Sequence, residues 1–108
     1  MLILFDQATP VPLRTYLLGH TVRTAAQQGW DRFRNGELLK AAEDAGFDVL
    51  LTTDKNMRYQ RNLSGRKIAV LVLSRQQWKQ ILPHAQLVLD AINLAEAGSF
   101  AEVMIPPD

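Results

Sequence analysis

The sequence contains no cysteine and only two histidines. Without cysteine, a disulfide framework and a thiolate zinc site are both excluded, and an intracellular protein is the simplest interpretation. His20 and His84 lie far apart in the chain and lack the spacing of paired metal ligands, which argues against a histidine-based metal site.

Long hydrophobic runs and a strong charge of one sign are also missing. No apolar run approaches the length of a membrane span, and the apolar start at residues 1–5 lacks the basic leader of a signal peptide. Lysine and arginine number 12 against 11 acids, so the net charge of +1 identifies no class of partner. These absences predict a cytoplasmic protein without a membrane segment.

The composition that remains is typical of one globular domain. The chain has 108 residues, of which 47% are hydrophobic and 21% are charged. This length is close to the commonest domain size and suffices to bury one core without disulfides or metals. We therefore expect a single domain over residues 1–108.

Apolar runs predict the strands. Residues 2–5, 49–53 and 68–73 are short and almost continuously apolar, which is typical of strands buried in a parallel sheet. Two weaker segments, 20–24 and 100–105, are expected to extend the sheet, the second as an edge strand that ends before two prolines.

Capping residues predict the helices between these strands. Thr9 followed by proline predicts the start of one helix, Asn35 predicts the cap of another, and Ser74 with Gln77 matches a capping box. The expected helices cover residues 10–18, 36–45, 74–82 and 83–97, and residues 55–66 are expected to form a loop with one irregular turn.

The alternation of buried strands with helices predicts the fold class. It is typical of an α/β fold with a mostly parallel central sheet of four to five strands and helices on both faces. The crossovers between parallel strands are expected to be right-handed.

Two aspartates follow predicted strands directly, Asp6 after the first and Asp54 after the third. Parallel strands end at the same edge of a sheet, and the crevice where the strand order reverses is the usual ligand site. Two carboxylates there repel each other unless a cation or a proton intervenes, and such pairs bind Mg²⁺ or Mn²⁺. Helix capping or an Asx turn would explain either aspartate alone, but explains both together less readily.

Four more polar residues are expected near this edge. Glu37 lies in the first turn of a predicted helix, where the helix dipole alone would favour an acid by about 0.3–1 kcal/mol. Its predicted nearness to the same edge makes it a third carboxylate candidate. Gln7 and Asn56 can coordinate or donate hydrogen bonds without adding charge, and Lys55 can pair with a carboxylate or bind phosphate.

A basic stretch without acids follows Asp54 and comprises Lys55, Arg58, Arg61, Arg66 and Lys67. A solvated loop is its simplest interpretation, but beside an acidic site it could contact phosphates. Tyr59 could stack on a base, although a lone tyrosine more commonly packs. Trp30, Phe33 and Trp78 are expected to belong to the core or to a partner surface.

Three segments resemble the short bacterial PIN-like domain family, a compact relative of the PIN nucleases. They are residues 4–14 (LFDQATPVPLR), 35–39 (NGELL) and 48–60 (DVLLTTDKNMRYQ), of which the last is the most specific. The resemblance covers nearly the whole chain in order and spacing. It implies a PIN-like three-layer sandwich with acids at the sheet edge, which in active PIN nucleases bind Mg²⁺ or Mn²⁺ and cut RNA. It also implies a partner, because members are often encoded beside a small antitoxin-like protein.

Carried over by position, the resemblance places Asp6, Glu37 and Asp54 at the acidic sites of the family. Many relatives have further acids where this chain has Gln7 and Asn56. The expected site therefore has three carboxylates instead of about five, which suits one metal ion better than two.

The leading hypothesis from the sequence is a metal-dependent ribonuclease that is the toxin of a toxin–antitoxin pair. RNA would be held by Arg14, Arg58, Tyr59 and Arg61. A catalytically weak or inactive RNA- or protein-binding module is an alternative, favoured by the two amides. A phosphoacceptor domain like the response-regulator receiver is a lower-ranked one. The sequence leaves open whether the protein forms a homodimer.

Overall fold

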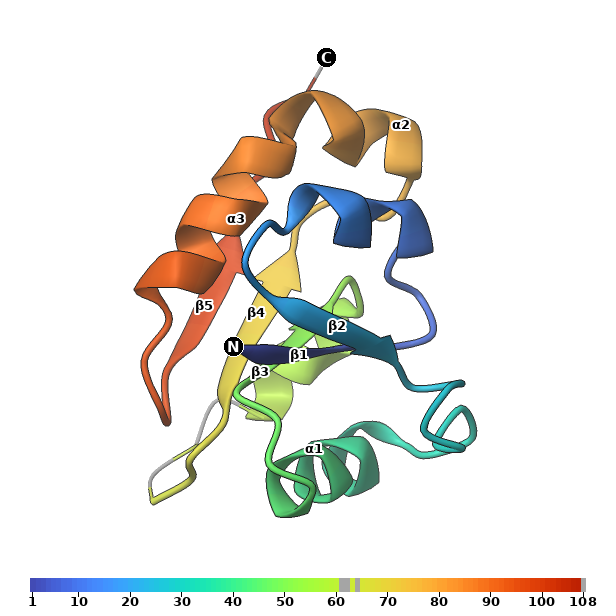
Figure 1. Cartoon of the computed structure of the whole chain (residues 1–108), viewed down its shortest axis with the longest axis vertical. Helices are drawn as coiled ribbons and strands as arrows, with labels where there is room; N and C mark the ends of the chain where they lie inside the picture. Colours follow the sequence, from blue (N-terminus) through green and yellow to red (C-terminus); the bar gives the residue numbers. More distant parts are fainter. Residues whose placement is uncertain (61–62, 64, 108) are drawn as a thin grey trace.

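Five parallel strands form one sheet in the order β2-β1-β3-β4-β5 (Figure 1). The computed structural model describes residues 1–60, 63 and 65–107, with the side chains of residues 58–60 left out. The strands are β1 (Leu2–Phe5), β2 (Thr21–Thr24), β3 (Val49–Thr52), β4 (Ala69–Leu73) and β5 (Phe100–Val103). The α/β class and the parallel sheet predicted from the sequence are confirmed, including the edge position of β5.

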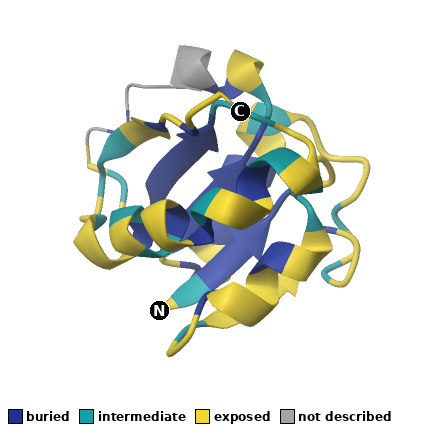
Figure 2. Cartoon of the chain, turned by 90° about the horizontal axis from the view of Figure 1, so that it is seen from above, coloured by how far each residue is buried: buried dark blue, intermediate teal, exposed yellow. Residues whose placement is uncertain are grey.

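Two apolar layers cover the sheet, one on each face. Residues 3, 5, 49, 51, 71 and 73 face one layer, which we call the α3 face, and residues 4, 50, 70 and 72 face the other, which we call the α1 face. All residues of β3 and β4 are buried because both of their faces are covered. The dark strands between lighter helices in Figure 2 show this arrangement.

Helical segments lie on both sides of the sheet (Figure 1). The α3 face carries η1 (Val11–Tyr16), α2 (Trp78–Ile81), η3 (Leu82–His84) and α3 (Ala85–Leu94). The α1 face carries α1 (Asn35–Asp44) and η2 (Lys55–Gln60). In the part of the chain described here, no helix is both long enough and apolar enough to cross a membrane.

Three local predictions differ from the structure. The segment expected as a helix over residues 10–18 is a six-residue 3₁₀ helix with a proline in its first turn, where the amide of Leu13 bonds the carbonyl of Pro10. Asn35 is the first residue of α1, and its cap position is taken by Arg34. The capping box at Ser74 is wrong, because α2 begins at Trp78 and Ser74 Oγ accepts the amide of Ile105 at 2.7 Å.

The last crossover has the opposite hand from the others, so the expectation of uniformly right-handed crossovers is wrong. The chain goes from β1 to β2 across the α3 face, and then returns to β3 and on to β4 across the α1 face. From β4 to β5 it continues in the same direction but crosses the α3 face. Helix α3 thereby covers Leu71 and Val103, which would otherwise face water.

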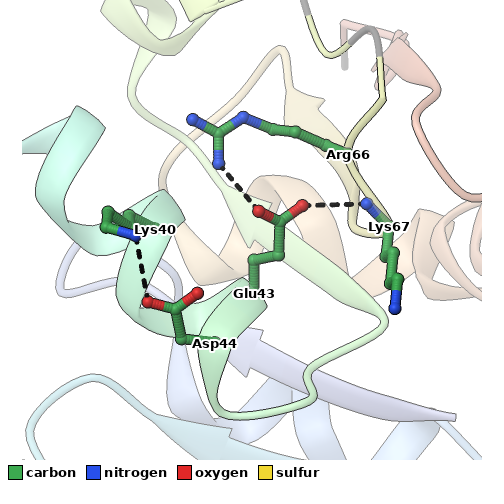
Figure 3. Close-up of polar contacts among 5 residues, drawn as sticks. All are labelled: Lys40, Glu43, Asp44, Arg66 and Lys67. Atoms are coloured by element: carbon green, nitrogen blue, oxygen red, sulfur yellow. Dashed lines mark hydrogen bonds and ion pairs between the residues drawn. The ribbon is translucent and has the colours of Figure 1, made fainter.

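A half-buried ion pair ties α1 to the chain before β4 (Figure 3). Glu43 Oε1 lies 3.2 Å from Arg66 Nη1, and its Oε2 accepts the backbone amide of Lys67 at 2.8 Å. The neighbouring pair of Lys40 and Asp44 lies on the exposed side of the same helix at 3.2 Å. The Glu43 contacts fix the position of α1 on the sheet.

The strand order places a reversal between β1 and β3. The connection from β1 leads to β2 on one side, and the chain then returns to β3 on the other side. In open parallel sheets, ligands bind at the carboxyl ends of the strands where such a reversal occurs. Asp6 follows β1 and Asp54 follows β3, so both lie at this position.

Candidate functional site at the carboxyl edge of the sheet

The carboxylate of Asp6 is buried and held by two threonines. Asp6 is only 9% exposed. Thr9 donates its amide at 3.1 Å and places its hydroxyl 2.6 Å from Asp6 Oδ1, while the Thr52 hydroxyl donates to Oδ2. Both oxygens of Asp6 therefore have a partner, as a buried carboxylate requires.

Asp54 is half-buried and is fixed by its own turn and by α1. Its Oδ1 accepts the backbone amide of Asn56 at 2.9 Å, which is an Asx turn. Its Oδ2 accepts a hydrogen bond from Nδ2 of Asn35 at 3.3 Å. The capping and turn contacts considered for this residue from the sequence are therefore present, and they leave a lone pair on each oxygen for a further ligand.

The two carboxylates influence each other electrostatically. Burial raises the pKa of Asp6 above its usual value of 3.8, the hydrogen bonds from Thr52 and Thr9 lower it in part, and the charge of Asp54 raises it further. The net effect is a raised pKa. A cation between these carboxylates would remove both the repulsion and part of the cost of burial.

A cavity of about 470 Å³ opens over these aspartates. Of the four further polar residues expected at this edge, three line the same cavity, namely Gln7, Lys55 and Asn56. A volume of this size lies within the usual range for sites that take small ligands. The cavity contains both carboxylates and therefore joins the ends of β1 and β3 in one site.

Glu37 is not part of this cavity. It is exposed in the first turn of α1, and its Oε1 accepts the backbone amide of Arg34 at 3.2 Å. This contact is the helix-capping role that was the simpler interpretation of the residue. Across the described residues, no group of three or more histidine, cysteine or acidic side chains is placed to hold a metal ion.

The proposed RNA contacts lie outside the cavity or outside the described side chains. Arg14 is exposed on η1 and does not line the cavity. Arg58 and Tyr59 belong to η2, but their side chains are not described, and Arg61 lies outside the described residues.

Nine cavity residues were not predicted to belong to the site, and three of them, Ala8, Ala25 and Leu38, are small or aliphatic. Asp31, Asn35, Thr53 and Gln76 add polar groups, and Trp30 and Phe33 add aromatic rings. Thr53 is fully buried, and its hydroxyl has no hydrogen-bond partner within the described part of the chain. The doubled threonine before Asp54 was a signal for Thr53, whereas residues 30–33 precede α1 without a periodic pattern that would place them.

The aromatic side of the cavity is a stacked pair. The rings of Trp30 and Phe33 are nearly parallel, with an angle of 11° and centroids 6.3 Å apart. The ring of buried Phe47 is inclined by 67° to that of Trp30, with centroids 5.9 Å apart. Trp30 and Trp78 pack against the core as expected, and Trp30 and Phe33 also line the cavity, which was not expected.

The fold and the cavity define an α/β domain with a carboxylate pair at the reversal point of a parallel sheet. Comparison with protein-family models, with curated proteins and with solved structures finds no match.

Proposed function

We propose that the protein is a ribonuclease that depends on Mg²⁺ or Mn²⁺ and has a PIN-like fold. The observation that supports this most is the shared cavity of Asp6 and Asp54 at the reversal between β1 and β3. The sequence resemblance to the PIN-like family is the basis for proposing RNA cleavage as the reaction. It is also the basis for the proposed role as the toxin of a toxin–antitoxin pair.

The oxygen atoms around the cavity suit one divalent cation. Asp6 and Asp54 supply negative charge, and the side-chain oxygens of Gln7 and Asn56 supply neutral ligands. Mg²⁺ prefers this combination of one or two carboxylates with neutral oxygens and water.

When bound, a divalent cation supplies Lewis acidity for water and for the phosphate that is cut. The chain itself contributes position and charge. Thr9 and Thr52 hold the Asp6 carboxylate in a fixed orientation. Lys55, exposed at the rim, is the one cation that lines the cavity in the described residues and would pair with a phosphate oxygen.

The remaining parts of the proposal concern RNA and a protein partner. Exposed Arg14 and the basic residues after Asp54, Arg58 and Arg61, are the proposed contacts to the RNA backbone, with Tyr59 beside them. The proposed partner is a small antitoxin encoded next to this gene.

A non-catalytic binding module is the second candidate. It is favoured by the small number of carboxylates, because Glu37 binds Arg34 and the described residues hold no metal-binding group of three or more side chains. Such a module would keep the cavity and the RNA contacts without turnover.

RNA cleavage in Mn²⁺ separates the two candidates. We expect wild-type protein to cut unstructured RNA, and Asp54→Asn to lose activity by at least about 100-fold. Asp44→Asn is the matched control, since this acid lies on the exposed side of α1. Equal activity in wild type and Asp54→Asn would overturn the proposed role, and RNA binding without any cleavage would select the binding module.

A further inference from the structure

We propose that Trp30 and Phe33 form a stacking platform for one unpaired nucleobase beside the carboxylate pair. The inference rests on the proposed ribonuclease function and names its substrate class as single-stranded RNA. One base would lie on Phe33 while the adjoining phosphate reaches the side of the cavity that holds Asp6 and Asp54.

Phe33 is 42% exposed although it lies next to a second aromatic ring. An apolar ring that is partly exposed in a concave polar site is typical of a ligand contact. Phe33 therefore keeps apolar surface that a planar partner can cover.

The platform is held in place by a core aromatic ring and by backbone hydrogen bonds. The Trp30 ring packs against buried Phe47, and the backbone amide of Trp30 donates to the carbonyl of Ala25 at 2.8 Å. The amide of Phe33 in turn bonds the carbonyl of Trp30 at 3.1 Å. A ring pair fixed in this way loses little freedom when a base stacks on it, which favours binding.

Polar groups for the edge of a base line the same cavity. Asp31 and Asn35 lie close in sequence to the platform, and both line the cavity. A base presents donors and acceptors around an apolar face, so it matches a site with this mixture of rings and polar atoms.

The charge of the cavity favours a base over a bare phosphate at the platform. Among the side chains that the structure describes, Asp6, Asp31 and Asp54 line the cavity together with a single cation, Lys55. Their carboxylates would repel a phosphate that is not neutralised, whereas a neutral base carries no such penalty. Stacking depends little on base identity, so the platform would hold any unpaired base.

Binding of short oligonucleotides tests the platform without requiring cleavage. Fluorescein-labelled hexauridylate and an abasic six-unit chain with the same phosphates are titrated in EDTA and in Ca²⁺, with anisotropy as the readout. We expect wild type to prefer hexauridylate. Phe33→Ala should bind it about 5- to 100-fold more weakly, with unchanged binding of the abasic chain. Phe33→Tyr should retain the preference because it keeps the ring.

Tyr16→Ala is the matched control. Tyr16 is 45% exposed and packs on Trp78 outside the cavity, so its removal should leave both affinities unchanged. Equal binding of the two oligonucleotides by wild type, equal binding of hexauridylate by wild type and Phe33→Ala, or no binding at all would each overturn the platform. Quenching of Trp30 by tetramethylammonium but not by hexauridylate would assign the rings to an organic cation instead.

The cleavage assay distinguishes failure of the platform from failure of the nuclease. Base binding that depends on Phe33 without cleavage in Mn²⁺ would contradict the ribonuclease and retain the platform. Cleavage by wild type together with unchanged binding by Phe33→Ala would contradict the platform alone.

Discussion

The hydroxyl of Thr52 lies between the two aspartates: it donates to the buried carboxylate of Asp6 and accepts the backbone amide of Asp54 at 2.9 Å. One side chain at the end of β3 therefore orients the acid that follows β1 and the acid that follows β3. The position of each carboxylate depends on the same hydroxyl. A substitution of Thr52 is therefore expected to displace both carboxylates together.

Thr52→Val should destabilise the protein and disturb both acids. Valine keeps the shape but leaves Asp6 Oδ2 and the Asp54 amide without this partner, which should cost about 1–3 kcal/mol of unfolding free energy. Urea denaturation measures the change. Thr15→Val is the control, because its exposed hydroxyl bonds the carbonyl of Pro12 and its loss should cost less than about 0.5 kcal/mol. Equal costs for the two variants would contradict the role of Thr52.

Asp6→Asn should make the metal-free protein more stable at pH 7 while it abolishes activity. Burial raises the pKa of Asp6 in the folded protein, so the folded state binds a proton more tightly than the unfolded state. The free energy of unfolding therefore falls as pH rises from the usual pKa of 3.8 through the raised pKa of Asp6. Above that range the full loss of stability from the buried charge is reached. Asparagine carries no charge and avoids this cost.

Thermal unfolding in EDTA across a pH series measures this effect. The advantage of Asp6→Asn over wild type should be largest at neutral pH and should shrink as pH drops below the raised pKa of Asp6. A constant difference between the two proteins at all pH values would show that Asp6 titrates as an ordinary exposed acid. A stable but inactive variant would fit a carboxylate that is kept for function.

Glu43→Ala should cost more stability than Asp44→Ala, although the two acids are adjacent in α1. Glu43 binds both Arg66 and the amide of Lys67 in a half-buried position, and we expect its loss to cost about 1–2 kcal/mol (Figure 3). Asp44 makes an exposed pair with Lys40, which is worth at most about 0.5 kcal/mol. Chemical denaturation compares them, and a larger cost at Asp44 would contradict the proposed anchoring of α1.

The sequence predicted the sheet well because buried parallel strands have a strong local signal. The apolar runs at residues 2–5, 49–53 and 68–73 each became a central strand, and each needs only its own composition to be recognised. The path of the last crossover over the α3 face of the sheet could not be predicted in this way. It depends on which apolar face of the finished sheet remained uncovered, and that is a property of the whole fold.

The site was predictable only where it follows from the strands. Asp6 and Asp54 share a cavity because both follow strands that lie side by side. Glu37 was expected there from its predicted nearness to the edge and from the resemblance, but its carboxylate accepts the amide of Arg34. Trp30 and Phe33 enter the cavity from an irregular segment, whose path is set by packing on Phe47 instead of by any periodic pattern.

Calorimetric titration of Mn²⁺ into metal-free protein tests most directly whether Asp6 and Asp54 together hold a divalent cation. The proposal predicts saturable binding of one ion by wild type and by Asp44→Asn, and affinity lower by more than about 10-fold in Asp54→Asn. Equal Mn²⁺ affinity in wild type and Asp54→Asn, or no saturable binding by wild type, would contradict it.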